Sequence, residues 1–297
     1  MDGVDVTAED LGLKGPRGWA FSGITLEAEP GSLIAIEGPS GSGRTCLLLA
    51  LTGRMKPTEG VAAVGGFKLP RHMAAVRRVA AVANVTGVTD LEPALTVGEH
   101  LRERALLQRR FGDSLREVLR PRPQRVHEER LRVDAALAAA GLDLETLPKG
   151  SRTAVRDLER LQELRLSVAL ALVGRPRLLG VDDIDVKLSD SERAEVWGLL
   201  RSLTRAGTTA VAVCRTAPED CVRVSTVRRD GTSGPADDRN GSGNGGRADG
   251  RSASGNGEPP DGRSEPEDGA PADGAHKTDR GEPEEEARDA LTEAGRA

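Results

Sequence analysis

Short apolar runs recur along the first 230 residues and alternate with longer amphipathic stretches. Each run has the length of a β-strand, and uninterrupted apolar strands are typical of a mostly parallel sheet that is covered on both faces. The runs lie at residues 32–37, 60–64, 79–85, 178–182 and 208–213. Because helical stretches separate them, the pattern predicts an α/β fold.

A second feature is a long helical region between about residues 95 and 173. Three helices are expected within it, at residues 99–111, 126–142 and 155–173. Pro121 and Pro123 separate the first from the second, and turn residues separate the second from the third. The region therefore interrupts the series of strands as a helical insertion.

From Asp230 onward the chain consists mainly of Gly, Ser, Pro, Arg, Asn and acidic residues, and Leu291 is its single large aliphatic residue. Such a segment cannot bury enough apolar surface to offset the entropy of ordering it. We interpret residues 230–297 as a disordered, solvated tail and favour the view that it has no specific task.

Removal of this tail gives a direct test. Deleting residues 231–297 is expected to leave the thermal unfolding midpoint unchanged, because the segment has almost no side chain that could join a core. Thermal melts of the full and shortened chains measure the effect. A fall of several degrees, equivalent to about 1 kcal/mol or more in a domain of this size, would show that the tail packs.

Charge and cysteine content narrow the functional classes. The formal net charge of −5 gives no reason to expect a nucleic-acid partner. Three cysteines, an odd number without metal-ligand spacing, suit a reducing compartment. The first residues are acidic and no stretch approaches 18 consecutive apolar residues, so we expect neither a signal peptide nor a membrane span. A membrane role would require a partner.

Residues 38–45 read GPSGSGRT, the spacing of a phosphate-binding loop (P-loop), between an expected strand and an expected helix. Glycines let backbone N–H groups surround phosphate oxygens, and the helix N-terminus attracts the same anion. This predicts a phosphate-binding site with Mg²⁺ held by Thr45; a glycine-rich turn without a ligand is the disfavoured alternative. The expected contact residues are Gly38, Pro39, Ser40, Gly41, Ser42, Gly43, Arg44, Thr45 and Cys46.

Further along the chain, residues 171–183 (ALVGRPRLLGVDD) resemble the segment that leads into the Walker B motif of ATP-binding cassette (ABC) ATPases. Residues 158–165 (LERLQELR) stand where that family has its Leu-Ser-Gly-Gly-Gln signature, and residues 95–101 (LTVGEHL) resemble the segment after its Q-loop. The resemblance covers about residues 4–228.

This resemblance implies a P-loop NTPase cassette at residues 1–229, with a RecA-like, mostly parallel sheet and a β subdomain. Its RecA-like lobe would comprise about residues 1–92 and 174–229, and its helical subdomain about residues 93–173. The resemblance also implies a homo- or heterodimer of such cassettes, with two ATP molecules at its interface. A permease-like integral membrane subunit would dock on the helical subdomain, which places the chain in the cytoplasm at the inner face of the cell membrane.

The resemblance also assigns roles to individual residues. Thr45, Asp182 and Asn84 would hold Mg²⁺, and Asn84 stands in place of the family's glutamine. Asp183 would position the attacking water, although the family has the longer glutamate. Arg215 replaces the switch histidine, so it can contact a phosphate but cannot accept a proton.

Other family positions differ more strongly. Arg44 replaces the P-loop lysine and keeps its charge on a bulkier planar group. Ser189 stands at the D-loop aspartate, and the adenine-stacking aromatic is absent, with Trp19 as a substitute or as plain packing. In the signature, Glu159, Arg160 and Leu161 replace Ser-Gly-Gly.

Two interpretations of the signature region remain open at this point. Glu159 would bring a carboxylate toward the phosphates of a partner's ATP unless Arg160 compensates. The interpretation we favour is a core-facing helix, because apolar residues recur at helical spacing. They are Val155, Leu158, Leu161, Leu164, Val168 and Leu172.

Two functions fit this sequence. The first is the ATP-binding subunit of an ABC transporter that hydrolyses ATP slowly. The alternative is a nucleotide-responsive regulatory module that binds ATP without transport turnover. A P-loop kinase or GTPase fits less well, since the guanine-reading Asn-Lys-x-Asp sequence is absent.

Overall fold

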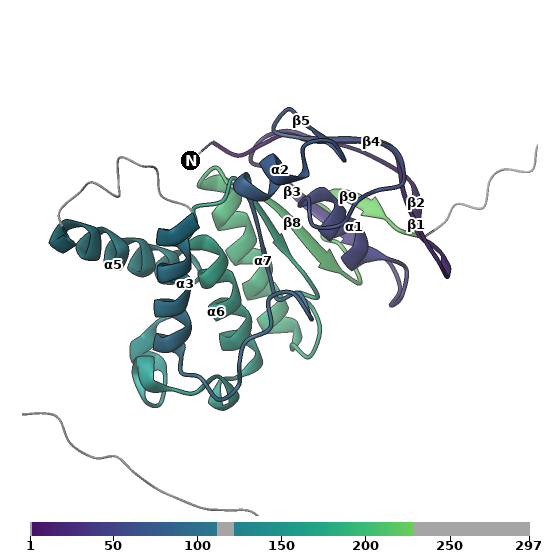
Figure 1. The fold of residues 1–297 in the computed structure, drawn as a ribbon. Helices are drawn as coiled ribbons and strands as arrows, with labels where there is room; N and C mark the ends of the chain where they lie inside the picture. Colours follow the sequence, from purple (N-terminus) through teal and green to yellow (C-terminus); the bar gives the residue numbers. More distant parts are fainter. Residues whose placement is uncertain (1, 112–121, 228–297) are drawn as a thin grey trace, which may run out of the picture. The chain divides into compact units, whose positions relative to one another are not determined.

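The computed structural model describes residues 2–111 and 122–227 of the chain (Figure 1). The segment expected to be a disordered tail, residues 230–297, lies outside these ranges, as does Pro121.

A five-stranded sheet forms the centre of the described part, with the strand order β6-β7-β8-β3-β9. All four neighbouring pairs are parallel. Four of the five apolar runs are thereby confirmed as its strands, and β9 was not expected. The strands are β3 (Leu33–Glu37), β6 (Ala80–Ala83), β7 (Leu178–Val181), β8 (Thr209–Cys214) and β9 (Val222–Ser225).

The fifth run, residues 60–64, is a strand, but its placement in the parallel sheet is wrong. It belongs to an antiparallel sheet of order β2-β1-β4-β5. Gly65 and Gly66 both have positive φ and form the tight turn that reverses the chain into β5. The strands are β1 (Val6–Gly15), β2 (Gly18–Ala28), β4 (Glu59–Val64) and β5 (Phe67–Leu69).

The helical region agrees with the sequence pattern except at its boundaries. Leu158 and Glu159 have extended backbone angles, so the third expected helix begins at Arg160 and a 3₁₀ turn, Val155–Asp157, precedes it. The second begins at Arg122, and Pro123 lies in its first turn, where a missing N–H costs no hydrogen bond. The helices are α1 (Arg44–Leu51), α2 (Met73–Val79), α3 (Val97–Phe111), α5 (Arg122–Ala139), α6 (Arg160–Leu172) and α7 (Asp190–Arg205).

Two hydrophobic cores cover the two faces of the parallel sheet. Alternate residues of each strand point to opposite faces, so Leu33 and Ala35 join one core and Ile34 and Ile36 join the other. The first core includes residues of α3, α5, α6 and α7, and the second includes α1 and the antiparallel sheet. Figure 1 shows α3, α5 and α6 on one side of the sheet and α1 on the other.

Thr209 joins the start of β8 to two distant segments. Its buried hydroxyl donates to the Val4 carbonyl oxygen over 2.7 Å and accepts from the N–H groups of Val4 and Gly31.

Thr209→Val is expected to lower the free energy of unfolding by about 2–3 kcal/mol, because these backbone groups lose their partner inside the core. Urea denaturation measures the change. Thr208→Val is the control at the neighbouring residue, since Thr208 is also largely buried but its hydroxyl makes no hydrogen bond within the described residues, and equal losses would contradict the prediction.

Candidate functional site

The candidate site residues gather at one edge of the parallel sheet. In a parallel sheet all carboxyl ends meet at the same edge, where ligands of α/β proteins bind. Gly38 follows β3, Asn84 follows β6, Asp182 follows β7 and Arg215 follows β8. Segments almost 180 residues apart along the chain therefore meet around the start of α1.

The loop 38–43 has the backbone that its glycines predict. Gly41 and Gly43 have φ of 80° and 83°, values that side-chain-bearing residues rarely adopt. A Cβ at Gly43 would lie 2.0 Å from the Ala20 carbonyl oxygen, so only glycine fits there. Ser42 Oγ lies 2.6 Å from Thr226 Oγ1, which ties the loop to the end of β9. The first N–H groups of α1 follow the loop and can face an anion.

Thr45 and Asp182 form the central contact of this edge. The Thr45 hydroxyl donates to Asp182 Oδ2 over 2.8 Å, and Asp182 Oδ1 accepts from the backbone N–H of Asp183 over 3.1 Å. Burial raises the pKa of the Asp182 carboxyl, and the hydrogen bond from Thr45 opposes that shift. A hydroxyl beside a carboxylate is a set of hard oxygen donors, the kind that Mg²⁺ prefers. The pair therefore fits the metal that the sequence predicted.

Asn84 lies next to this pair in a left-handed backbone conformation, with φ of 56°. Its backbone N–H donates to Ser167 Oγ over 2.7 Å, and its side-chain Nδ2 donates to the Asp182 carbonyl oxygen over 2.7 Å. Its Oδ1, the atom expected to face Mg²⁺, accepts from Arg160 Nη2 over 2.9 Å. The candidate metal ligand is thus hydrogen-bonded to the signature region of its own chain.

Arg44 is buried, with 8% of its surface exposed. Its Nη1 donates to the Cys214 carbonyl oxygen over 2.7 Å, and its Nη2 lies 3.7 Å from Asp183 Oδ1. The guanidinium therefore lies between the end of β8 and the carboxylate expected to position water. Asp183 has a φ of 43° and remains half-exposed, so its carboxylate can reach solvent.

Two cysteine thiols of this region are neutral at ordinary pH. Burial, followed by the charges of Asp185 and Glu37, raises the pKa of the Cys214 thiol to about 12. Burial also raises the pKa of the Cys46 thiol, and nearby Asp182 adds to the shift. Cys46 can therefore contribute its backbone N–H to the site, not a thiolate.

Arg215 stands at the end of β8 with an exposed side chain. Its backbone N–H donates to Asp185 Oδ2 over 2.6 Å, while Asp185 Oδ1 is buried without a hydrogen-bond partner among the described residues. The side chain makes no hydrogen bond or ion pair within the described ranges, so its guanidinium can reach a ligand from solvent.

The apolar side of the signature region is part of the core, as the favoured interpretation predicted, while Glu159 is exposed. Leu161, Leu164 and Val168 are buried in the first core, and Leu158 and Leu172 pack against it. Gln162 Oε1 accepts from the backbone N–H of Glu159, which stabilises the start of α6. Trp19 is half-buried, and Lys14 Nζ lies 5.5 Å from the centroid of its ring, within the range of a cation–π contact.

Sequence reasoning missed Ser167 and Thr226, which hold Asn84 and Ser42. A hydroxyl inside an otherwise apolar stretch, residues 166–173, was the available signal for Ser167. Thr226 gave no signal, because it follows a strand that was not expected.

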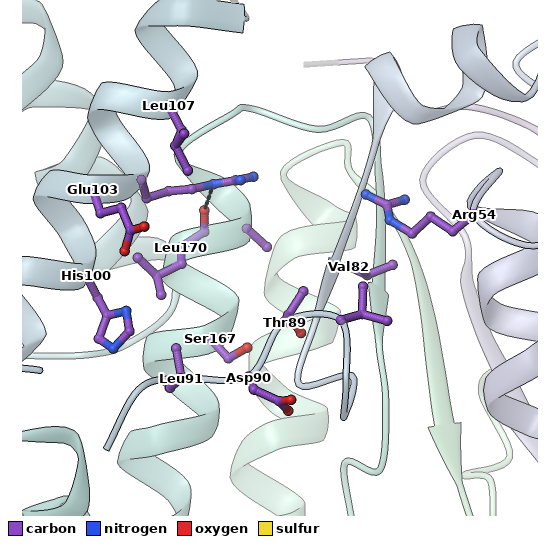
Figure 2. A pocket seen from close by; sticks show the side chains of 13 residues that line it. Arg54, Val82, Thr89, Asp90, Leu91, His100, Glu103, Leu107, Ser167 and Leu170 are labelled. Atoms are coloured by element: carbon purple, nitrogen blue, oxygen red, sulfur yellow. Dashed lines mark hydrogen bonds between the residues drawn. The ribbon is translucent and has the colours of Figure 1, made fainter. Parts of the chain in front are cut away.

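A separate pocket of about 430 Å³ lies between α3, α6 and β6 (Figure 2). In Figure 2, Arg54 points into it from one wall, and His100, Glu103 and Leu107 lie on the helix opposite. Arg104, also in the lining, donates from Nε to the Leu170 carbonyl oxygen over 2.9 Å. Burial, then the charges of Arg104 and Arg77, lowers the pKa of Arg54 to about 10. Arg54 and Arg104 therefore bring two positive charges to this pocket, and neither forms an ion pair with an acid among the described residues.

Comparison with known proteins identifies the class. The family model described as ABC transporter matches residues 21–185. The match covers more than half of the chain, so this protein belongs to the ABC transporter family. No helix in residues 2–111 and 122–227 has the length and apolarity needed to cross a membrane.

Individual relatives agree with this assignment. Nod factor export ATP-binding protein I of Cupriavidus metallidurans is 31% identical over 63% of this chain and 54% of its own length. Arabinose import ATP-binding protein AraG of Burkholderia pseudomallei is 29% identical over 67% of this chain and 36% of its own length. The chain thus spans about half or less of the curated relatives it matches.

Solved structures show the same fold. The ATP-binding cassette MJ0796 bound to ADP and Pi, a dimer in a post-hydrolysis state, matches with a TM-score of 0.55 at 23% identity. The match covers 71% of this chain and 88% of that one. CbiO1 from Clostridium perfringens, part of the transporter complex cbiONQ, matches with a TM-score of 0.57 at 19% identity. Here the match covers 74% and 86% of the two chains. The cassette fold predicted from the sequence is confirmed.

Proposed function

We propose that this chain is the ATP-binding subunit of an ABC transporter, which binds Mg·ATP at the 38–45 loop and hydrolyses it slowly. The observation that carries the proposal is the 2.8 Å contact between Thr45 and Asp182 at the mouth of that loop. It brings the last residue of a P-loop and the acid after β7 together at the carboxyl edge of the sheet. That arrangement suits a nucleotide with its metal ion.

Each residue would have a distinct task in this function. The glycine backbone of loop 38–43 and the N-terminus of α1 would bind the phosphates. Thr45 and Asp182 would hold Mg²⁺, which neutralises phosphate charge when bound. Asp183 would position the water, and Arg215 would approach the terminal phosphate as a cation. Slow hydrolysis follows from the short Asp183 side chain and its neighbour Arg44.

The partners we propose are a second ATP-binding cassette and an integral membrane permease-like subunit, with the chain peripheral at the cytoplasmic face. The relatives' names, export and import ATP-binding proteins, support this proposal. The pocket of Figure 2, between α3, α6 and β6, is the concave surface that we propose for contact with the membrane subunit.

The alternative, a regulatory module that binds ATP without transport turnover, is favoured by a specific observation. Asn84 Oδ1 and Arg44 are both hydrogen-bonded within the chain, so two groups expected to serve hydrolysis have other partners.

One experiment distinguishes the transporter subunit from the regulatory module. It is co-purification with a multi-span membrane protein encoded by a neighbouring gene, followed by an ATPase assay of the complex. A stable complex whose ATPase rises with transport substrate supports the transporter subunit. A chain that binds ATP but captures no such partner supports the module.

A further inference from the structure

We propose that Arg160 is a positioning residue for the nucleotide site of its own chain, and that it competes with Mg²⁺ for the Oδ1 atom of Asn84. The inference rests on the proposed function, because it requires Mg·ATP at the 38–45 loop. It assigns a role within one chain to a residue in the stretch that resembles the signature.

The carboxamide of Asn84 has a defined orientation. Its Nδ2 donates to the carbonyl oxygen of Asp182 over 2.7 Å, a contact that a carboxamide oxygen could not make. The remaining atom, Oδ1, therefore faces Arg160, whose Nη2 donates to it over 2.9 Å. Because the backbone N–H of Asn84 also donates to Ser167 Oγ, both the backbone and the side-chain amide of this residue are held in place. The hydrogen bond from Arg160 thus determines whether Asn84 Oδ1 is available to a metal ion.

Only some of the hydrogen-bond donors of the Arg160 guanidinium have partners. Its Nη1 donates to Glu163 Oε2 over 2.8 Å, one turn further along α6. Its Nε is buried without a hydrogen-bond partner among the described residues. A buried donor without a partner is unfavourable, so this position is not the best the guanidinium could have. The unsatisfied Nε therefore favours displacement of the guanidinium from Asn84.

The preference of Mg²⁺ for oxygen ligands gives it a chemical reason to displace Arg160 from Asn84 Oδ1. Mg²⁺ takes oxygen ligands and usually binds through one or two carboxylates together with substrate phosphates. Thr45 and Asp182 already lie together, and Asn84 is hydrogen-bonded to the backbone of Asp182. Asn84 Oδ1 is the nearby amide oxygen that could join them, and a guanidinium bound to the same atom opposes that ligation.

The test measures how ATP affinity depends on Mg²⁺ concentration, by equilibrium titration with a fluorescent ATP. Arg160→Met keeps the aliphatic stem and removes every donor. The Mg²⁺ concentration at half-maximal effect is expected to fall about tenfold, since one charge-assisted hydrogen bond no longer opposes the metal. With EDTA in place of Mg²⁺, ATP affinity is expected to stay within about twofold of the original chain.

The Asn84→Ala background distinguishes this role from a structural one. There, adding Arg160→Met is expected to change nothing, because the shared atom is gone. Arg165→Met is the matched control, since Arg165 lies on the same helix and pairs with Glu195 Oε2 over 2.6 Å. It should leave the Mg²⁺ dependence unchanged. Should Arg160→Met fail to fold, Arg160→Lys replaces it, because a single nitrogen on a shorter side chain stands in for the two separate nitrogens that bond Glu163 and Asn84.

Each outcome decides the proposal. An unchanged Mg²⁺ dependence in Arg160→Met and Arg160→Lys, with ATP binding intact, overturns the role of Arg160 and leaves the proposed function standing. An equal effect in the Asn84→Ala background also overturns it. Failure of the unaltered chain to bind ATP overturns the proposed function, and the role of Arg160 with it.

Discussion

Replacing Thr45 and Asp182 together by alanine is expected to weaken Mg·ATP binding by about 100-fold or more. The two side chains contact each other at 2.8 Å and are the proposed protein ligands of the metal. Loss of even an outer-shell partner around a metal costs about 10- to 100-fold in metal affinity, so loss of two direct ligands should cost at least as much. Equilibrium binding with labelled ATP in the presence of Mg²⁺ measures the change.

Two controls make this result specific. Thr45→Ser keeps the hydroxyl and should stay within a few-fold of the original affinity. In EDTA the double variant and the original chain should bind ATP alike, because the difference depends on the metal. Thermal melts must show that the double variant folds, since Asp182 is buried. Equal affinity of the two proteins in Mg²⁺ would refute the proposed nucleotide site.

The second large effect concerns ATP turnover. As a homodimer the unaltered chain is expected to hydrolyse ATP slowly, because each site would combine Arg44, Asp183 and Arg215 with the altered signature. Restoring the family's residues together should raise turnover by about 100-fold or more, since a single transition-state stabiliser is worth about 10²- to 10³-fold. Restoring one alone should recover little. The combined variant carries Arg44→Lys, Asp183→Glu, Arg215→His, Glu159→Ser and Arg160→Gly.

The structure limits the design of that variant. Leu161 stands at the second glycine of the signature, but it is 8% exposed and belongs to the first core. Leu161→Gly would open a cavity, and emptying a buried leucine position costs about 2–5 kcal/mol, so Leu161 is retained. A steady-state phosphate-release assay gives the rates. Turnover of several per second by the unaltered homodimer would contradict the whole account of impaired hydrolysis.

Local chemistry allowed the sequence to predict the phosphate loop and most elements of the parallel sheet. Gly41 and Gly43 fill positions of positive φ, and the apolar runs have the length and composition of buried strands. Once the strands are parallel, their carboxyl ends must share one edge. The meeting of Thr45 and Asp182, 137 positions apart, could therefore be expected without coordinates.

Tertiary structure alone decided the partners of the charged and amide side chains. Arg44 donates to the Cys214 carbonyl oxygen 170 positions away, and Asn84 accepts from Arg160 76 positions away. The sequence also placed residues 60–64 in the wrong sheet and began α6 too early. A long polar side chain can reach several partners, and the one it bonds depends on the distances to them and on how deeply each is buried. Those distances depend on how helices pack onto the sheet, which a local residue pattern does not specify.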